Sequence, residues 1–187
     1  MRKLVLFIFV FFISQFALAQ TPRLEVFGGY SFLHSPKENF NGWNTSATFN
    51  VYRCIGITAD FDGHYRSQTT TFPGVGTIIG RTRAYSFSFG PGVSLRNKSR
   101  LTPFARFLIG AKRFTFDNTV QGVPGLGSGD SVNFLTVITG GGLDVALNSR
   151  LSIRPVQFDY QTVDFNGYWG NSVRYSAGIV FRWGEKK

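Results

Sequence analysis

Apolar and polar residues alternate along most of this chain with a period of two. In the stretch YSAGIVFRW at 175–183, every second residue is an aromatic, an aliphatic or an alanine, and the residues between them are mostly small or polar. This period indicates an extended strand rather than a helix. The same alternation recurs seven times earlier in the chain, among many Phe, Tyr, Val, Ile and Thr residues that favour strands. It predicts eight strands, at 24–33, 43–52, 55–65, 83–95, 101–114, 132–147, 151–162 and 173–183.

The predicted connections between these strands alternate in length. Those at 53–54, 96–100 and 148–150 are tight, whereas those at 34–42, 66–82, 115–131 and 163–172 are longer and rich in Gly, Ser, Thr, Asn and Pro. A meander with turns at one end and loops at the other gives this rhythm, which is typical of outer-membrane barrels. Two strands carry irregularities. We expect a bend or bulge at Gly140–Gly142, and a β-bulge at Pro155, where the alternation breaks.

One face of the predicted strands is charged and the other is apolar. The charged face carries five acids and four arginines, which could pair with one another. An eight-stranded barrel has an interior that side chains fill. We therefore predict a charged lumen and an apolar outer face in contact with lipid. The predicted lumen network consists of Glu25, Asp60, Asp62, Arg106, Asp144, Arg154, Asp159, Arg174 and Arg182.

Aromatic residues also gather near the loop ends of the strands, as in a belt at a membrane interface. They are Tyr30, Phe32, Trp43, Tyr65, Tyr85, Phe114, Tyr160 and Tyr175. The alternative is a soluble sandwich or lipocalin-like barrel, in which the apolar face forms the core and the charges are solvated.

The first twenty residues have the pattern of an export signal. Arg2 and Lys3 precede an apolar run, and Ala17-Leu18-Ala19 forms a cleavage pattern. We expect residues 1–19 to be removed and residues 20–187 to form one barrel domain. Removal lowers the formal net charge from +10 to +8, because residues 1–19 hold two basic residues and no acid. The basic residues form no stripe, so we expect no nucleic-acid partner. The single cysteine, Cys54, excludes an internal disulfide, and its role is open.

The predicted last strand resembles the closing strand of Gram-negative outer-membrane proteins. The fragments GGGLDVAL (140–147), RLSIRPVQFDY (150–160) and YSAGIVFRWG (175–184) are similar to small outer-membrane β-barrels of the OmpA transmembrane-domain and OmpX type. This resemblance implies a porin-like fold, insertion by the barrel-assembly machinery and a strand 173–183 that closes on strand 24–33. The implied assembly signal comprises Tyr175, Ile179, Phe181 and Trp183.

Catalytic, cofactor and metal sites have weak support in the sequence. His34 lies beside Ser35, and His64 follows Asp60 and Asp62 at the end of the third strand. A lipid-modifying enzyme would need such a His with a Ser or an acid facing lipid. The alternation along the third strand, however, points the His64 side chain into the mouth of the lumen. We therefore interpret His64 as a polar rim residue. The histidines and the cysteine show no metal-ligand spacing and no phosphate-loop motif occurs, so we expect no enzyme, no cofactor and no metal.

Five basic residues are predicted at the outer rim, where they could contact the phosphates of lipopolysaccharide. They are Arg66, Arg81, Arg83, Lys112 and Arg113. Together these patterns predict an all-β, eight-stranded antiparallel up-and-down transmembrane barrel in the outer membrane. We expect it to be a monomeric, non-enzymatic protein whose loops serve envelope integrity or surface interaction. Its partners would be outer-membrane lipid and lipopolysaccharide. The alternatives are a channel or carrier for small or apolar solutes, a lipid-modifying enzyme and a soluble lipocalin-like barrel.

Overall fold

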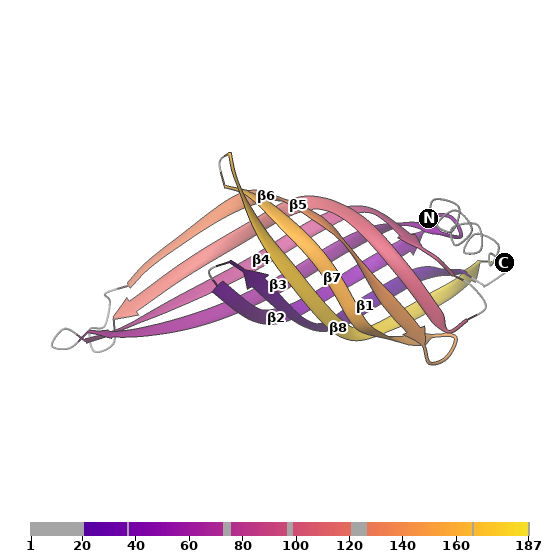
Figure 1. Cartoon of the computed structure of the whole chain (residues 1–187), viewed down its shortest axis with the longest axis horizontal. Coiled ribbons are helices and arrows are strands. Elements are labelled where there is room, and N and C mark those ends of the chain that lie inside the picture. Colours follow the sequence, from indigo (N-terminus) through magenta and orange to yellow (C-terminus); the bar gives the residue numbers. More distant parts are fainter. Residues whose placement is uncertain are drawn as a thin grey trace, which may run out of the picture.

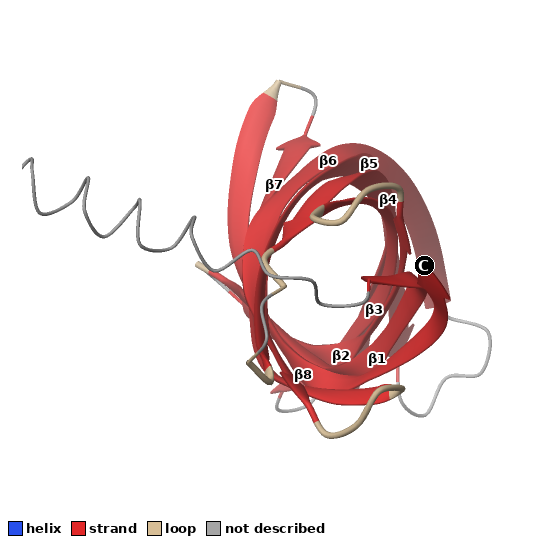
Figure 2. Ribbon diagram, turned by 90° about the vertical axis from the view of Figure 1, so that its right-hand side faces the viewer, coloured by secondary structure: helices blue, strands red, loops and turns tan. Residues whose placement is uncertain are grey.

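The computed structural model is a closed barrel of eight antiparallel strands (Figures 1 and 2). It describes residues 21–36, 38–72, 76–96, 99–120, 127–165 and 167–186, so the predicted signal peptide at 1–19 lies outside the described residues. No helix in these ranges is long and apolar enough to cross a membrane. The strands are β1 Thr21–Ser35, β2 Glu38–Asn50, β3 Ile55–Phe72, β4 Gly76–Ser94, β5 Leu101–Val120, β6 Gly127–Ala146, β7 Leu151–Phe165 and β8 Tyr168–Lys186.

The barrel closes between its first and last strands, as predicted. β1 pairs with β8 from Thr21↔Lys186 to His34↔Val173. Each of the other strands pairs with its neighbours in the sequence, so the order around the barrel is the order along the chain. The prediction of an eight-stranded up-and-down barrel is therefore confirmed. Where all eight strands are paired, closure leaves no free sheet edge, because each strand has a partner on both sides.

The two ends of the barrel differ. Short connections at 51–54, 95–100 and 147–150 lie at one end, where β1 also begins and β8 also ends; we call this the turn end. At the opposite end, which we call the hairpin end, the prediction of four long loops is wrong. Strands continue through most of those segments, and β3 and β4 stay paired to Phe72↔Gly76.

The wall is also taller on one side. β2 pairs with β3 only as far as Asn41↔Tyr65, and β6 pairs with β7 only from Leu135↔Asp164. β3, β4, β5 and β6 therefore extend past their neighbours as two long hairpins (Figure 1).

The predicted bulge at Pro155 is confirmed, because the β7–β8 register shifts between Arg154 and Gln157. A second shift, in the β6–β7 pairing, falls between Leu143 and Val145. The expected bend at Gly140–Gly142 is thus displaced by a few residues. The glycines themselves stay in regular pairing with β7.

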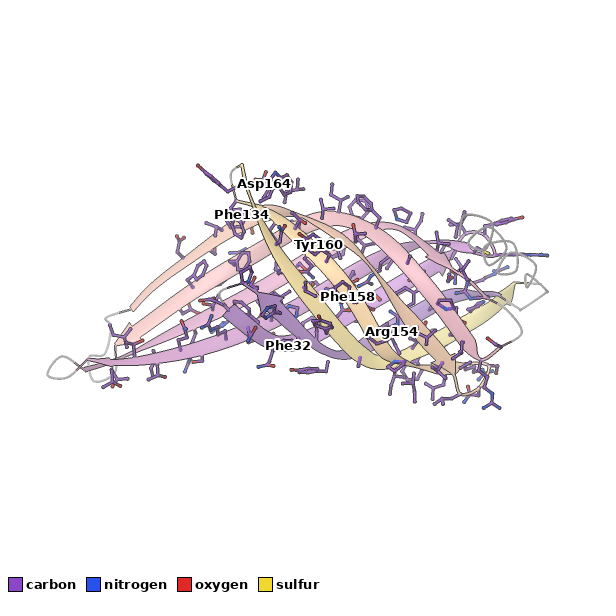
Figure 3. The ribbon with its side chains drawn as sticks, viewed as in Figure 1. Phe32, Phe134, Arg154, Phe158, Tyr160 and Asp164 are labelled. Atoms are coloured by element: carbon purple, nitrogen blue, oxygen red, sulfur yellow. The ribbon has the colours of Figure 1, made fainter. Side chains whose placement is uncertain are left out.

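The outer face of the barrel is apolar and the inner face is mostly polar. Large apolar side chains such as Phe89, Phe107 and Ile179 remain 45–56% exposed, and Phe158 and Tyr160 project from the outer face (Figure 3). Buried side chains are predominantly Ser, Thr, Asn, Gln, Asp and Arg. A soluble sandwich with an apolar core is excluded by this arrangement, because the apolar face is the exposed one.

Candidate functional site

Three acids and two arginines form a cluster across the middle of the barrel. Asp60 and Asp62 come from β3, Asp159 from β7, Arg106 from β5 and Arg174 from β8. Arg174 donates to Asp159 Oδ2 at 2.9 Å and to Asp60 Oδ1 at 3.0 Å, and it also contacts Asp62. Arg106 bonds both oxygens of Asp159, at 3.1 and 2.9 Å, and lies 2.8 Å from Asp60. All five are at most 5% exposed.

Two amides complete the central cluster. Gln157 Nε2 donates to Asp159 Oδ2 at 2.7 Å and to Asn44 Oδ1 at 3.1 Å, and Asn44 Nδ2 donates to Asp60 Oδ2 at 3.0 Å. Such pairing is required here, because an unpaired charge in this interior would be very costly. The cluster links β2, β3, β5, β7 and β8 across the lumen and blocks it.

A second cluster lies closer to the turn end. Arg154 holds Asp144 with two bonds of 2.7 and 3.0 Å, and its guanidinium stacks 4.5 Å from the ring centre of Phe27 and 4.0 Å from that of Phe104. Arg182 donates to Glu25 at 3.0 Å. All nine predicted lumen residues therefore lie inside the barrel in these two clusters.

Arg96 is a member of this cluster that the sequence analysis missed. It also contacts Glu25, and its side chain is 7% exposed although its backbone belongs to the β4–β5 turn. Alternation along a strand gives no signal for a turn residue that reaches inward, so this contact could not be read from the sequence. A small polar cavity of about 30 Å³ adjoins the cluster, which leaves room for about one water molecule.

The interpretation of His64 as a rim residue is wrong, because the side chain is fully buried. Its Nε2 lies 2.9 Å from Ser31 Oγ and its Nδ1 lies 3.0 Å from Asp62 Oδ1. A serine, a histidine and an acid in this order resemble a hydrolytic triad. Ser31 is also 0% exposed, however, and Ser176 donates to it at 3.1 Å. The group therefore has no access to lipid.

The half of the lumen near the hairpin end is apolar, which the sequence analysis did not predict. Phe114, expected in the outer belt, points inward and packs on Phe134 and Phe165 at centroid distances of 6.1 and 5.9 Å. A cavity of about 460 Å³ lies here. Its apolar lining residues are Leu33, Pro36, Phe40, Phe114, Phe116, Val163 and Phe165, and its polar ones include Ser35, Glu38, Thr82, Asn171 and Ser172.

Lys112 lines the same cavity, so its predicted position at the outer rim is wrong. It is 1% exposed and its Nζ donates to Gln161 Oε1 at 2.7 Å. Its even position on β5 places it on the inner face, two residues before Phe114.

The other four predicted rim arginines lie near the hairpin end on the taller side of the wall. Arg66 is 2.7 Å from Glu38, and Arg83 is 3.3 Å from Asp117. Arg113 donates to Ser131 at 2.9 Å. Arg81, Arg83 and Arg113 are exposed on β4 and β5. In the strand pairing Arg83 lies opposite Tyr65 and Arg113 lies opposite Tyr85, and Arg81 is two residues farther toward the hairpin end. The rings of Tyr65 and Tyr85 contact each other edge to face at 5.8 Å.

The four residues of the proposed assembly signal share the outer face of β8. Tyr175, Ile179, Phe181 and Trp183 are 45–50% exposed. Phe181 and Trp183 stack with centroids 5.8 Å apart. Within the described ranges, no three His, Cys, Asp or Glu side chains are grouped so that they could hold a metal ion.

Comparison with solved structures shows small outer-membrane barrels with the same fold. Ail of Yersinia pestis, solved in complex with the heparin analogue sucrose octasulfate, has a TM-score of 0.58 and 15% identity, over 89% of this chain and all of that one. Neisserial surface protein A has a TM-score of 0.55 and 13% identity, over 86% and 96% of the two chains. OprG of Pseudomonas aeruginosa has a TM-score of 0.54 and 9% identity, over 88% and 97%.

No model of a known protein family matches the chain, and no curated protein matches it. The likeness to the solved barrels, at these identities, concerns the fold.

Proposed function

We propose that the protein is a non-enzymatic integral barrel of the outer membrane, with the hairpin end outside the cell and the turn end in the periplasm. The observation that carries this proposal is the exposed apolar face on a closed barrel whose interior is polar. A bilayer requires every backbone amide to be paired, and closure provides this. An OmpA- or OmpX-like role in envelope integrity or surface contact, insertion by the barrel-assembly machinery and a monomeric state belong to the same proposal.

Fractionation and a gel shift test this membrane assignment. A closed barrel in the envelope should be found in the outer-membrane fraction and should migrate differently on SDS gels before and after boiling. Recovery from the soluble fraction with no heat shift would contradict the proposal.

The exposed arginines of β4 and β5 support a more specific role, the binding of lipopolysaccharide phosphates. Arg83 and Arg113 lie beside the aromatic residues Tyr65 and Tyr85, and Arg81 lies two residues beyond, at the level where a headgroup phosphate would meet an outer rim. Arginine suits this ligand because its planar guanidinium forms two parallel bonds to phosphate oxygens. Ail, a barrel of this fold, was solved with the heparin analogue sucrose octasulfate, which supports anion binding by a barrel of this kind.

Replacing Arg81, Arg83 and Arg113 together by Ser tests this role. We expect weaker binding to lipopolysaccharide micelles and no change for micelles stripped of phosphate. Replacing the exposed turn-end residues Arg100 and Arg150 by Ser provides the matched control, which should bind like the wild type. Equal binding by both variants would contradict the role.

Two alternatives are disfavoured by particular contacts. A continuous channel is opposed by the central cluster, in which Arg174 and Arg106 join β3 and β7 across the lumen. A lipid-modifying enzyme is opposed by the burial of Ser31 and His64. A fluorophosphonate probe should therefore leave Ser31 unlabelled, whereas labelling of wild type but not of S31A would revive the enzyme hypothesis.

A further inference from the structure

The cavity at the hairpin end has apolar walls and a basic floor. Phe114 and Phe116 continue β5 outward from Lys112, and Leu33, Phe40 and Val163 line the other sides. The polar residues Ser35, Glu38, Thr82, Asn171 and Ser172 also line the cavity, and Glu38 is paired with Arg66. Its volume of about 460 Å³ falls within the range of about 300–1,000 Å³ that is usual for small-molecule sites. Phe116 and Phe165 remain 42% and 37% exposed, so the cavity opens at the hairpin end.

We propose that this cavity binds a medium-chain fatty carboxylate, with the carboxylate at Lys112 and the alkyl chain along the phenylalanines. The apolar walls account for the chain, because contact with them removes each methylene from water. The basic floor accounts for the carboxylate. Such a ligand is an amphiphile with its charged end innermost.

Lys112 lines the cavity with donor capacity to spare, and a second unused donor, on Gln161, lies next to it. Within the described part of the chain, Lys112 Nζ donates only to Gln161 Oε1, and no carboxylate lies within 4.0 Å of it. The amide nitrogen of Gln161 is buried without a partner, although buried polar atoms are normally bonded. An ammonium with two further N–H donors, beside an amide nitrogen without an acceptor, suits a carboxylate with two oxygens.

The central cluster closes the inner end of the cavity. The cavity is therefore a binding site and not part of a channel through the barrel. The central cluster of Asp62, Asp159 and Arg174 lies between Lys112 and the turn end. Binding in this cavity does not depend on contact between the outer arginines and lipopolysaccharide.

Binding of decanoate to the barrel in phospholipid nanodiscs tests the proposal. Carbon-13 spectra of carboxyl-labelled decanoate should show a bound signal with wild-type protein. Lys112→Met should weaken this binding by about tenfold or more, as expected when a bond to a buried charge is lost. Arg113→Met is the matched control: it removes a charge from the next residue of β5, on the outer face, and should bind decanoate like the wild type. Decanol, which lacks the charge, should bind wild type and Lys112→Met equally.

A variant that fills the cavity separates the pocket from the surrounding lipid. Val163→Trp should abolish binding of both decanoate and decanol, and Ser172→Trp, from β8, provides a second filling variant should the first fail to fold. The heat shift on SDS gels reports folding of each. Equal decanoate binding by Lys112→Met and wild type would overturn the carboxylate site. Unchanged binding by a folded filling variant, or no bound signal with wild type, would overturn the pocket.

Discussion

At the scale of single residues, Arg174 is the centre of the buried network. Its guanidinium contacts Asp60, Asp62 and Asp159 on two different strands. Removal of one partner from a buried ion pair costs about 3–5 kcal/mol, because it leaves a charge uncompensated. We expect Arg174→Met to lower the free energy of unfolding by about this amount, as measured by urea denaturation of the barrel in lipid vesicles.

Arg83→Met is the control for this prediction. Arg83 has one acidic partner, Asp117, and both side chains are more than one-third exposed. Exposed pairs contribute about 0–1 kcal/mol, so this variant should unfold close to the wild type. Equal unfolding of the two variants would show that the central cluster contributes no more than a surface pair.

The inward positions of the nine charged residues could be predicted because alternation fixes the face of each strand residue. For Lys112 the predicted position at the outer rim was wrong. Its parity matched that of Arg106, but its place near a predicted loop suggested the rim. Parity within the predicted strand 101–114 already placed Lys112 and Phe114 inward, and because β5 continues to Val120, the same parity places Phe116 inward as well. The apolar cavity is formed by the extended part of β5 together with the strands opposite it. The pattern of a single strand does not show which residues face it across the lumen.

At the scale of elements, the strands at the hairpin end are longer than their patterning indicates. Residues 66–72 include three consecutive threonines and no alternation of apolar and polar residues. Beyond the apolar band, neither face of the hairpin is buried against a core, so the alternating signal disappears while strand pairing continues. Sequence patterning therefore detected the part of each strand that has an inside and an outside.

A substitution at Gly140 tests how closely strands β6 and β7 must approach each other at the central cluster. A Cβ atom here would lie 2.3 Å from Asp159 Oδ1 and 2.4 Å from the Phe158 carbonyl oxygen. Gly140→Ala would push Asp159 away from Arg106 and Arg174, and overpacking of this kind costs about 1–3 kcal/mol. We expect a loss of this size in urea denaturation. Gly28→Ala is the control, since nothing lies within 4 Å of its added methyl group; a larger loss in this control would contradict the packing argument.

The outer face of β8 should contact lipid, and a charged substitution there tests this. Ile179 lies midway between Tyr175 and Trp183 on that face and is 45% exposed. An arginine at the bilayer midplane costs about 2–4 kcal/mol. We expect Ile179→Arg to destabilise the barrel in vesicles by this amount.

Tyr168→Arg provides the matched control. Tyr168 is 82% exposed at the start of β8, at the hairpin end, where an arginine would meet water and cost nothing measurable. If Ile179→Arg unfolded like this control, the apolar face would not be facing lipid.

At the scale of the whole molecule, both the barrel wall and the barrel interior differ between the turn end and the hairpin end. Ion pairs and a water-sized cavity occupy the turn end and the middle, and an apolar cavity with a lysine floor occupies the hairpin end. The taller strands and the exposed arginines are also at the hairpin end. The proposed contacts with ligands and lipopolysaccharide are therefore concentrated at one end of the barrel, and the orientation of the barrel in the membrane decides whether they face outward.

Cys54 provides a direct test of that orientation. It is the single cysteine of the chain and lies partly exposed in the β2–β3 turn. Because the turn end should face the periplasm, a large maleimide-polymer reagent that cannot pass the outer membrane should leave Cys54 unmodified in intact cells and modify it after lysis. In a Cys54→Ser background, Thr70→Cys moves the thiol to an exposed site on the β3 hairpin and should react in intact cells. The reverse pattern, with Cys54 modified from outside and Thr70→Cys protected, would place the arginines and the cavity in the periplasm and exclude lipopolysaccharide as their partner.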